Sequence, residues 1–376
     1  MSTLKVDAIR HNSATSDAIT TASDGTCTAR ITSINGGSGL SHRNIFINGA
    51  MTVAQRGVSS TTNGYGSVDR FYVGYNAVQE APTQAQADIS AGTTPYTLGF
   101  RKSLKITNGN QTSGAGAGEY IFINMPQEAQ NLATSGWNYK SSSSFITLSF
   151  WIKSSVAQNF FFQFDVRDGT RQNYTMETGS LTADTWTKIT KVIPGNSNLT
   201  IDNDNGVGAY VTFGVFWGTN YTASMSLETW GAANDSAKTP VNPTNWYNTN
   251  DATLEITGIQ LEVGDTATSF EHRSFAEEKK RCERYYQTYG FTTLMGSLAG
   301  QVGTPRILFP TEMRDTPSVT VEYGSNGNGS FRNQNNGSTL TGHTTFNYYT
   351  NGFDCRGNNG SANIIYSSTY KASAEL

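Results

Sequence analysis

The sequence has few cysteines, few charges and no long apolar run. Its three cysteines, Cys27, Cys282 and Cys355, lie far apart, so neither a disulfide framework nor a paired-cysteine metal motif can be read from them. Charged residues make up 15% of the chain and the net charge is −3, which argues against the basic field that a nucleic acid partner requires. No apolar run approaches the length of a membrane span, so we expect no membrane insertion.

The start of the chain lacks the apolar core of a secretory signal peptide. Lys5, Asp7 and Arg10 interrupt the first residues, MSTLKVDAIRHNSATSD, whereas a signal peptide needs a continuous apolar segment there. We therefore expect synthesis in a cytoplasm.

The common catalytic and cofactor-binding motifs are also missing. The sequence contains no GxGxxG fingerprint, phosphate-binding Gly-Lys-Ser/Thr, GxSxG elbow or HExxH pair, and its four histidines are dispersed. The adjacent Glu271 and His272 would act in catalysis only if the fold supplied a nucleophile, and a hinge position is the alternative. Residues 202–206 resemble a calcium loop in composition, but position twelve is Phe213 rather than Glu, which favours a plain turn. We expect no cofactor, no metal and no enzymatic activity.

Alternating apolar and polar residues are abundant. In FITLSFWIK, the residues Ile146, Leu148, Phe150 and Ile152 share one face, as in a half-buried strand. Similar runs occupy 68–73, 104–107, 120–124, 160–166, 187–193, 210–217 and 253–263. Turn residues separate them, so the pattern predicts an all-β, jelly-roll-like β-sandwich over residues 43–273.

Residues 1–42 differ from the rest of the chain. A brief apolar alternation is followed by a polar stretch that ends in Asn-Gly-Gly-Ser-Gly, which indicates a small arm and a flexible linker. Such an arm cannot bury a core alone, so it either pairs with another chain or is a frayed terminus. Leu4, Val6 and Ile9 are the candidate attachment residues.

The segment from Gly258 to Tyr286 gathers acids, a histidine and a cysteine. The apolar period of the strand 253–263 slips by one residue at Gly258, which predicts a β-bulge. On this register Glu255, Gln260 and Glu262 face solvent. The segment is then a joint between modules rather than an active site.

A helix over 274–290 is predicted after this strand, because Ser274 and Glu277 fit a capping box. Its solvated face would carry Glu277, Glu278, Lys279, Lys280 and Glu283. Its apolar stripe contains Phe275, Cys282 and Tyr286, and in a trimer three such stripes would meet at the axis.

Residues 291–376 form a distal β domain in this interpretation. Strands are predicted at 306–309, 318–323, 344–349, 353–356, 364–366 and 370–375. The Asn/Gly-rich loops between them are either a recognition surface or a solvent-facing spacer.

Four aromatic residues lie in a polar setting between Gly218 and Asn250. They are Tyr221, Trp230, Trp246 and Tyr247. Flat rings beside Asn, Ser and Thr can hold sugar rings, so these residues are candidates for glycan binding. The alternative is that they close the ends of the sandwich.

The sequence resembles tail-fibre-like and other appended virion proteins of tailed bacteriophages, especially phages of marine bacteria and cyanobacteria. The stretches that carry the resemblance are STLKVDAIRHNSAT, NIFINGAMTVAQRG, YGSVDRFYVG, SFITLSFWIKSS with WTKITKVIPGN, and ITGIQLEVGDTATSFEHRSFAEEKKRCERYYQTYG. The resemblance implies a carbohydrate-binding-module-like sandwich in a virion appendage. It also implies attachment to other virion proteins through the N-terminus and a homotrimer, and it supplies no catalytic residues.

The expected function is that of a tail fibre or similar appendage that contributes to recognition of a host surface glycan. One alternative is a head fibre or decoration protein with a purely architectural role. Another is a polysaccharide depolymerase, which would need a repetitive β-helix or a placed carboxylate pair.

Overall fold

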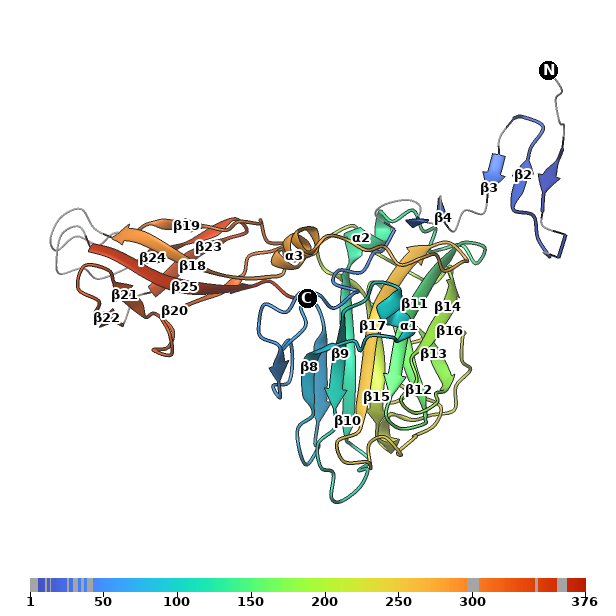
Figure 1. The fold of residues 1–376 in the computed structure, drawn as a ribbon, viewed down its shortest axis with the longest axis horizontal. Coiled ribbons are helices and arrows are strands. Elements are labelled where there is room, and N and C mark those ends of the chain that lie inside the picture. The colour runs from blue at the N-terminus through green and yellow to red at the C-terminus, as the bar shows by residue number, and fades with distance from the viewer. Residues whose placement is uncertain are drawn as a thin grey trace.

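The computed structural model describes residues 6–10, 12–13, 15–25, 27–29, 33–34, 37–38, 43–295, 304–341, 344–356 and 364–376. Figure 1 shows a small N-terminal sheet, a large β-sandwich and an elongated distal domain, with the C-terminus returning to the side of the sandwich near α3 (Phe275–Glu283). Most of the regular structure is β, which confirms the predicted fold class.

The N-terminal arm contains short strands. β1 (Ala8–Ile9), β2 (Ile19–Thr21) and β3 (Cys27–Ala29) form one antiparallel sheet, and β4 (Ser33–Ile34) pairs with β5 (Gly37–Ser38). Val6 and Ile9 are 41% and 52% exposed. Leu4, the third candidate attachment residue, lies outside the described residues, so attachment through this arm stays a prediction.

The sandwich consists of two six-stranded antiparallel sheets. Sheet 1 has the order β16-β13-β12-β15-β10-β7 and sheet 2 the order β14-β11-β17-β9-β8-β6. Sheet 1 comprises β7 (Tyr72–Asn76), β10 (Tyr120–Glu128), β12 (Asn159–Val166), β13 (Gln172–Ser180), β15 (Val207–Trp217) and β16 (Trp230–Ala232). Sheet 2 comprises β6 (Ser59–Ser60), β8 (Thr83–Asp88), β9 (Lys102–Thr107), β11 (Phe145–Ser154), β14 (Thr187–Pro194) and β17 (Thr253–Val263). Short helices α1 (Thr94–Thr97) and α2 (Ala129–Ala133) lie in the connections.

The hydrophobic core lies between these two sheets, as the alternation of apolar and polar residues in the strands predicts. Ile146, Leu148, Phe150 and Ile152 of β11 are completely buried, and burying such a side chain contributes about 1.5–3 kcal/mol each. The Phe150 ring meets the Phe162 and Phe213 rings of sheet 1 at centroid distances of 5.2 and 4.7 Å. The predicted strand 68–73 is the least accurate, because β7 begins at Tyr72.

The predicted bulge at Gly258 is confirmed. The β11–β17 register shifts opposite Ser149 and Trp151, and Gly258 has φ +63°. A side chain there would also clash, since an added Cβ would lie 2.6 Å from the Phe100 ring. Both constraints favour glycine at this position.

The prediction that Glu255, Gln260 and Glu262 face solvent is wrong. They are 7%, 1% and 2% exposed. The segment 264–273, here called the strap, folds back over Gln260 and Glu262 on the outer face of sheet 2. Glu255 instead accepts from Ser103 Oγ at 2.8 Å and pairs with Lys153. Gln260 Oε1 accepts the Glu271 N–H at 2.8 Å, and Glu262 accepts the Thr268 N–H at 2.9 Å. Gln260 and Glu262 therefore hold the strap in place.

The connecting helix is shorter than the predicted 274–290. Ser274 Oγ accepts the Glu277 N–H at 3.2 Å, which confirms the N-cap, but α3 ends at Glu283 and β18 begins at Tyr286. Glu278 and Glu283, expected on the solvated face, are buried. Glu278 lies close to the backbone N–H of Asn48, and Glu283 accepts from Thr311 Oγ1 at 2.7 Å.

The prediction that Phe275, Cys282 and Tyr286 form one apolar face of the helix is also wrong. Phe275 is exposed, whereas Cys282 and Tyr286 are buried within the chain. Tyr286 belongs to β18 rather than to the helix, and Arg56 of the sandwich covers its ring at 3.6 Å. The three side chains therefore cannot meet equivalent copies at one axis in this arrangement.

The distal domain contains two further antiparallel sheets. One has the order β18-β25-β21-β22, with β20 also paired to β25, and the other has the order β19-β24-β23. The strands are β18 (Tyr286–Met295), β19 (Arg306–Leu308), β20 (Ser318–Glu322), β21 (Phe331–Asn333), β22 (Thr339–Leu340), β23 (Thr344–Tyr349), β24 (Gly352–Arg356) and β25 (Ile364–Ser373). Two predicted strands, 364–366 and 370–375, thus form the single long β25.

Candidate functional site

The outer face of sheet 1 carries a cluster of aromatic rings. Strand alternation sends Val73, Ile121 and Ile123 into the core and turns Tyr72 and Phe122 outward. Tyr120 lies at the start of β10. Trp217 ends β15, and Tyr221 follows in the 3-10 helix η1 (Thr219–Tyr221), while Tyr65 flanks Tyr72. All of these rings are half-buried, so each keeps a solvent-accessible part.

Three of the rings form a nearly parallel row, here called the aromatic row: Tyr72, Phe122 and Trp217. The centroids of Phe122 and Trp217 are 5.5 Å apart at an interplanar angle of 10°, and those of Tyr72 and Phe122 are 6.1 Å apart at 17°. Tyr120 lies 5.4 Å from both Trp217 and Tyr221 and meets Tyr221 edge to face.

Two glycines, Gly74 and Gly214, leave room for the rings of Phe122 and Trp217 to pack against the backbone of the sheet. Phe122 pairs with Gly74 on β7 and with Gly214 on β15. A Cβ at Gly74 would lie 2.3 Å from the Phe122 ring, and a Cβ at Gly214 would lie 2.1 Å from Trp217 Nε1. The Phe122 ring therefore occupies the space that a side chain on the neighbouring strand β7 would need, and the Trp217 ring occupies the space above Gly214 of its own strand. The result is a flat aromatic surface rather than a set of upright side chains.

Neutral hydrogen-bonding groups surround the aromatic row. Asn124 Oδ1 accepts from Thr212 Oγ1 at 2.9 Å beside Tyr72, and Asn63 Oδ1 accepts from the Tyr72 hydroxyl at 3.3 Å. Burial raises the pKa of Tyr120 above its ordinary value of 10, so its hydroxyl stays protonated at neutral pH. An uncharged, partly apolar surface with amides and hydroxyls suits an uncharged polyhydroxylated ligand.

The loop after β15 covers the other half of this face. Gln163 Nε2 donates to the Lys238 carbonyl at 3.1 Å, and the Glu228 N–H donates to the Thr175 carbonyl at 2.8 Å. A hollow of about 190 Å³ remains between β13, β16 and this loop, lined mainly by small and polar side chains that include Asn173 and Asn234. The aromatic row lies on the half of the face beyond this loop.

Of the four aromatic residues predicted to bind glycans, Tyr221 joins the ring cluster. Trp230 instead packs against the core at the sandwich edge, where its ring lies 5.2 Å from that of Tyr174 and its Nε1–H donates to the Pro194 carbonyl at 2.7 Å. Its donor is thus engaged, while its half-buried ring also lines the hollow of about 190 Å³ beside β13.

For Trp246 and Tyr247 the glycan-binding prediction is wrong, because both are completely buried. The segment just before β17 places the side chains of Trp246 and Tyr247 inside the sandwich. The Tyr247 ring stacks on Phe216 at 3.9 Å, and its hydroxyl donates to Gln111 Oε1 at 3.2 Å. These two residues close the sandwich, which was the alternative.

The aromatic row itself was missed from the sequence. Its members fall in predicted strands, whereas the predicted glycan-binding residues are aromatic residues outside clear strands. The alternation in YIFIN (120–124) does predict the position of two of the clustered rings. It places Tyr120 and Phe122 on the outer face of the strand, on the side away from Ile121 and Ile123.

The remaining candidate sites are structural. His272 Nε2 lies 2.9 Å from the Leu98 carbonyl, to which it donates, while Glu271 accepts the Asn44 N–H at 2.7 Å and pairs with Arg273 at 3.2 Å. The 202–206 segment is a turn in which Asp204 accepts the Gly206 N–H at 2.9 Å. Within the described ranges, no group of three or more His, Cys, Asp or Glu side chains is placed to hold a metal, and no helix is long and apolar enough to cross a membrane.

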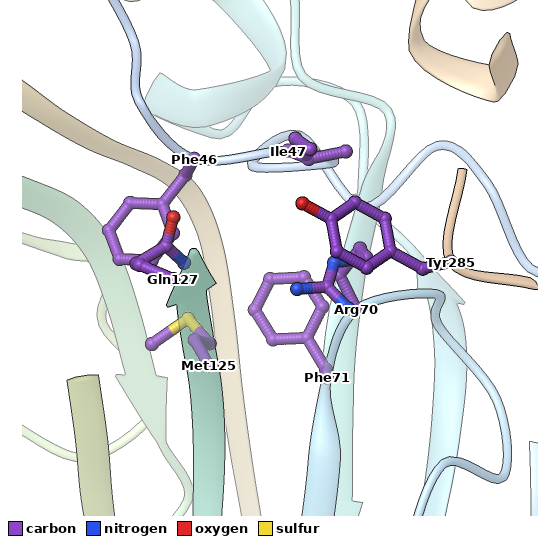
Figure 2. A pocket seen from close by; sticks show the side chains of 7 residues that line it. All are labelled: Phe46, Ile47, Arg70, Phe71, Met125, Gln127 and Tyr285. Carbon is purple, nitrogen blue, oxygen red and sulfur yellow. The ribbon is translucent and has the colours of Figure 1, made fainter. Parts of the chain in front are cut away.

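A small cavity marks the joint between the sandwich and the distal domain. Figure 2 shows the side chains around it, with the Arg70 guanidinium under the Tyr285 ring. The cavity measures about 10 Å³, which is room for about one water molecule. It is therefore too small for a sugar, and the polar groups around it serve the joint.

Comparisons with known proteins give structural neighbours only. No family model and no curated protein matches the sequence. The enzymatically active domain of bacteriophage CBA120 tailspike protein 4 matches with a TM-score of 0.31 and 10% identity over 59% of this chain and 21% of the tailspike chain. The N-terminal cellulose-binding domain of Cellulomonas fimi β-1,4-glucanase C matches with a TM-score of 0.27 and 8% identity over 57% of this chain and 99% of that domain. The family 11 carbohydrate-binding module of Clostridium thermocellum matches with a TM-score of 0.24 and 12% identity over 57% of this chain and 98% of that module. At these scores none of the neighbours supports a functional assignment by itself.

Proposed function

We propose that this chain is a non-enzymatic appendage protein of a tailed-phage virion, and that its sandwich binds an uncharged glycan on the aromatic row. The observation that carries the binding proposal is the pair of glycines beneath the rings. Gly74 and Gly214 let Phe122 and Trp217 lie flat at 5.5 Å from each other. A flat apolar surface of this kind complements the C–H faces of sugar rings, while Asn124 and Thr212 lie beside it for the hydroxyls.

The virion assignment is supported by the sequence stretches that resemble tail-fibre-like proteins. In this proposal the N-terminal arm binds another virion protein through Val6 and Ile9, whose exposed apolar side chains lie in an arm with little core of its own. Assembly as a homotrimer would present three aromatic rows together, and linked copies strengthen binding that is weak at each site.

The test is binding of the fluorescently labelled full-length protein to an array of neutral oligosaccharides and to host cells, with phage adsorption measured in competition. Trp217→Ala removes one ring of the row and should weaken neutral-glycan binding at least tenfold. Trp186→Ala is the matched control, because Trp186 is also half-buried but lies beside Lys153 on sheet 2.

Binding of neutral glycans that is lost in Trp217→Ala and kept in Trp186→Ala would support the proposal. No neutral-glycan binding by the assembled protein, combined with its location on the phage head, would replace it with the architectural role of a head fibre or decoration protein.

A further inference from the structure

We propose a second saccharide site on the opposite face of the sandwich, selective for a sugar that carries a carboxylate or another anionic group. A hollow of about 280 Å³ lies between sheet 2, the strap and the turn after α1. The residues that carry the proposal are Ser149 and Trp151 on β11, Lys188 on β14, and Thr268, Phe270 and His272 on the strap.

The wall of this hollow is an ordered part of the fold. Phe100, Phe270 and His272 form a cluster of rings with centroid distances of 4.9 to 5.1 Å. The hydrogen bonds from the strap to Gln260 and Glu262 hold it above the sheet. The hollow is thus bounded by side chains whose positions are fixed by their neighbours.

Trp151 supplies an aromatic surface inside the hollow. It is half-buried, and in the described part of the chain its ring stacks on no other ring. The hydroxyls of Ser149 and Thr268 and the backbone of Ser269 also line the space. An indole beside hydroxyl groups offers both the apolar and the polar contacts that a sugar ring needs.

Lys188 makes the site cationic. It is the cross-strand neighbour of Trp151, it is exposed, and no ion pair with it occurs among the described residues. None of the described residues that line the hollow is an acid. The acids of the adjacent β17 are already neutralised, since Glu255 pairs with Lys153 at 2.9 Å and Glu262 lies 3.6 Å from Arg43. The positive charge is therefore free to attract an anionic ligand.

Size and charge together define the ligand class. A volume of about 280 Å³ lies just below the range, from about 300 Å³, that holds drug-sized molecules. It suits a single sugar unit such as a uronic or sialic acid at a chain end. The aromatic row on sheet 1 is uncharged, so the two faces would select different sugars, and this inference does not depend on the first site.

The test uses the full-length protein on an array that carries uronate-, sialate- and sulfate-bearing oligosaccharides together with methyl-esterified forms of the uronates. We expect binding of at least one acidic sugar, weaker binding of its neutral ester, and a loss of at least tenfold in Trp151→Ala and in Lys188→Gln. Lys105→Gln is the matched control, because Lys105 is half-exposed on β9 of the same sheet and outside the hollow. Trp217→Ala should leave acidic-sugar binding unchanged, which separates this site from the aromatic row.

Absence of acidic-sugar binding by the wild-type protein would overturn the proposal, as would acidic-sugar binding that survives both Trp151→Ala and Lys188→Gln. Thermal unfolding of each variant establishes that it is folded. If Trp151→Ala does not fold, Lys188→Gln decides the outcome, because Lys188 is exposed and its replacement removes only the charge.

Discussion

The guanidinium of Arg70 lies 3.4 Å from the centre of the Tyr285 ring. Arg70 belongs to the sandwich, and Tyr285 connects α3 to the first distal strand, so this contact spans the joint between the two domains. Arg56 covers the next ring, Tyr286, in the same way at 3.6 Å. The carboxylate of Glu375, almost at the end of the chain, forms ion pairs with both arginines and is itself buried.

Replacing Glu375 with alanine should weaken this joint strongly. The change leaves Arg56 and Arg70 largely buried without their shared anion, and breaking a buried ion pair by removing one partner typically costs about 3–5 kcal/mol. Urea unfolding should show a loss of this order, and hydrogen exchange should show faster exchange around residues 284–286.

The control for this change is Glu322→Ala, which breaks the more exposed pair with Lys371. A surface pair contributes about 0–1 kcal/mol, so the control should be nearly neutral. Equal losses in the two variants would mean that Glu375 contributes no more than an ordinary surface charge.

Asp69 should make stability depend on pH near the same joint. Burial raises the pKa of its carboxyl from 3.8 to about 6, although hydrogen bonds from Gln55 and the charge of Arg56 oppose the shift. Because the folded state holds this proton more tightly, the contribution of Asp69 is fully present below about pH 4 and is lost as the pH rises through about 6.

Asp69→Asn removes this titration. Relative to the variant, the wild-type protein should lose about 1.4 kcal/mol of unfolding free energy per pH unit within that window. Urea unfolding of both proteins between pH 4 and pH 7 measures this difference. A difference that stays constant over the range would contradict the raised pKa.

Gly74→Ala tests the aromatic row without removing a ring. The new methyl group would lie 2.3 Å from Phe122, so the ring must lift from the sheet. Overpacking of this kind typically costs about 1–3 kcal/mol, and glycan binding should fall at least tenfold. Gly231→Ala on β16 of the same sheet is the control, since no atom of the described residues lies within 4 Å of its added Cβ. Unchanged binding in Gly74→Ala would remove the flat-ring account of the site.

The thiols should react with a maleimide in two classes. Cys27 is exposed, whereas Cys282 and Cys355 are buried. Burial raises the pKa of Cys355 to about 12 and that of Cys282 well above its ordinary value, and the thiolate is the reactive form. Mass spectrometry of the native protein should find one rapid label and two further labels only after denaturation. Rapid labelling or intermolecular crosslinking at Cys282 would instead restore the helix interface proposed from the sequence.

Local patterns predicted most of the sandwich because they reflect local geometry. The alternation in β11 and the one-residue slip at Gly258 both appear where the sequence places them. The buried acids could not be predicted in this way. Glu262 looks solvent-facing until the strap covers it, and its burial depends on Arg43 and Thr268 from elsewhere in the chain. Tyr286 fits a helical stripe equally well, and only pairing with Ser373 of β25 makes it a strand residue.

The return of the C-terminus to the sandwich has a mechanical consequence. The chain enters the distal domain at Tyr285 and comes back beside it, where the Ala374 N–H donates to the Tyr285 carbonyl at 2.8 Å and the Tyr65 hydroxyl donates to the Leu376 carbonyl at 3.1 Å. A third link joins Asn205 Nδ2 to the Arg314 carbonyl at 2.8 Å. A force on the distal domain is therefore distributed over several hydrogen bonds. The distal domain cannot rotate about a single backbone bond of the connecting segment unless the contacts of residues 374–376 with the rest of the chain break first.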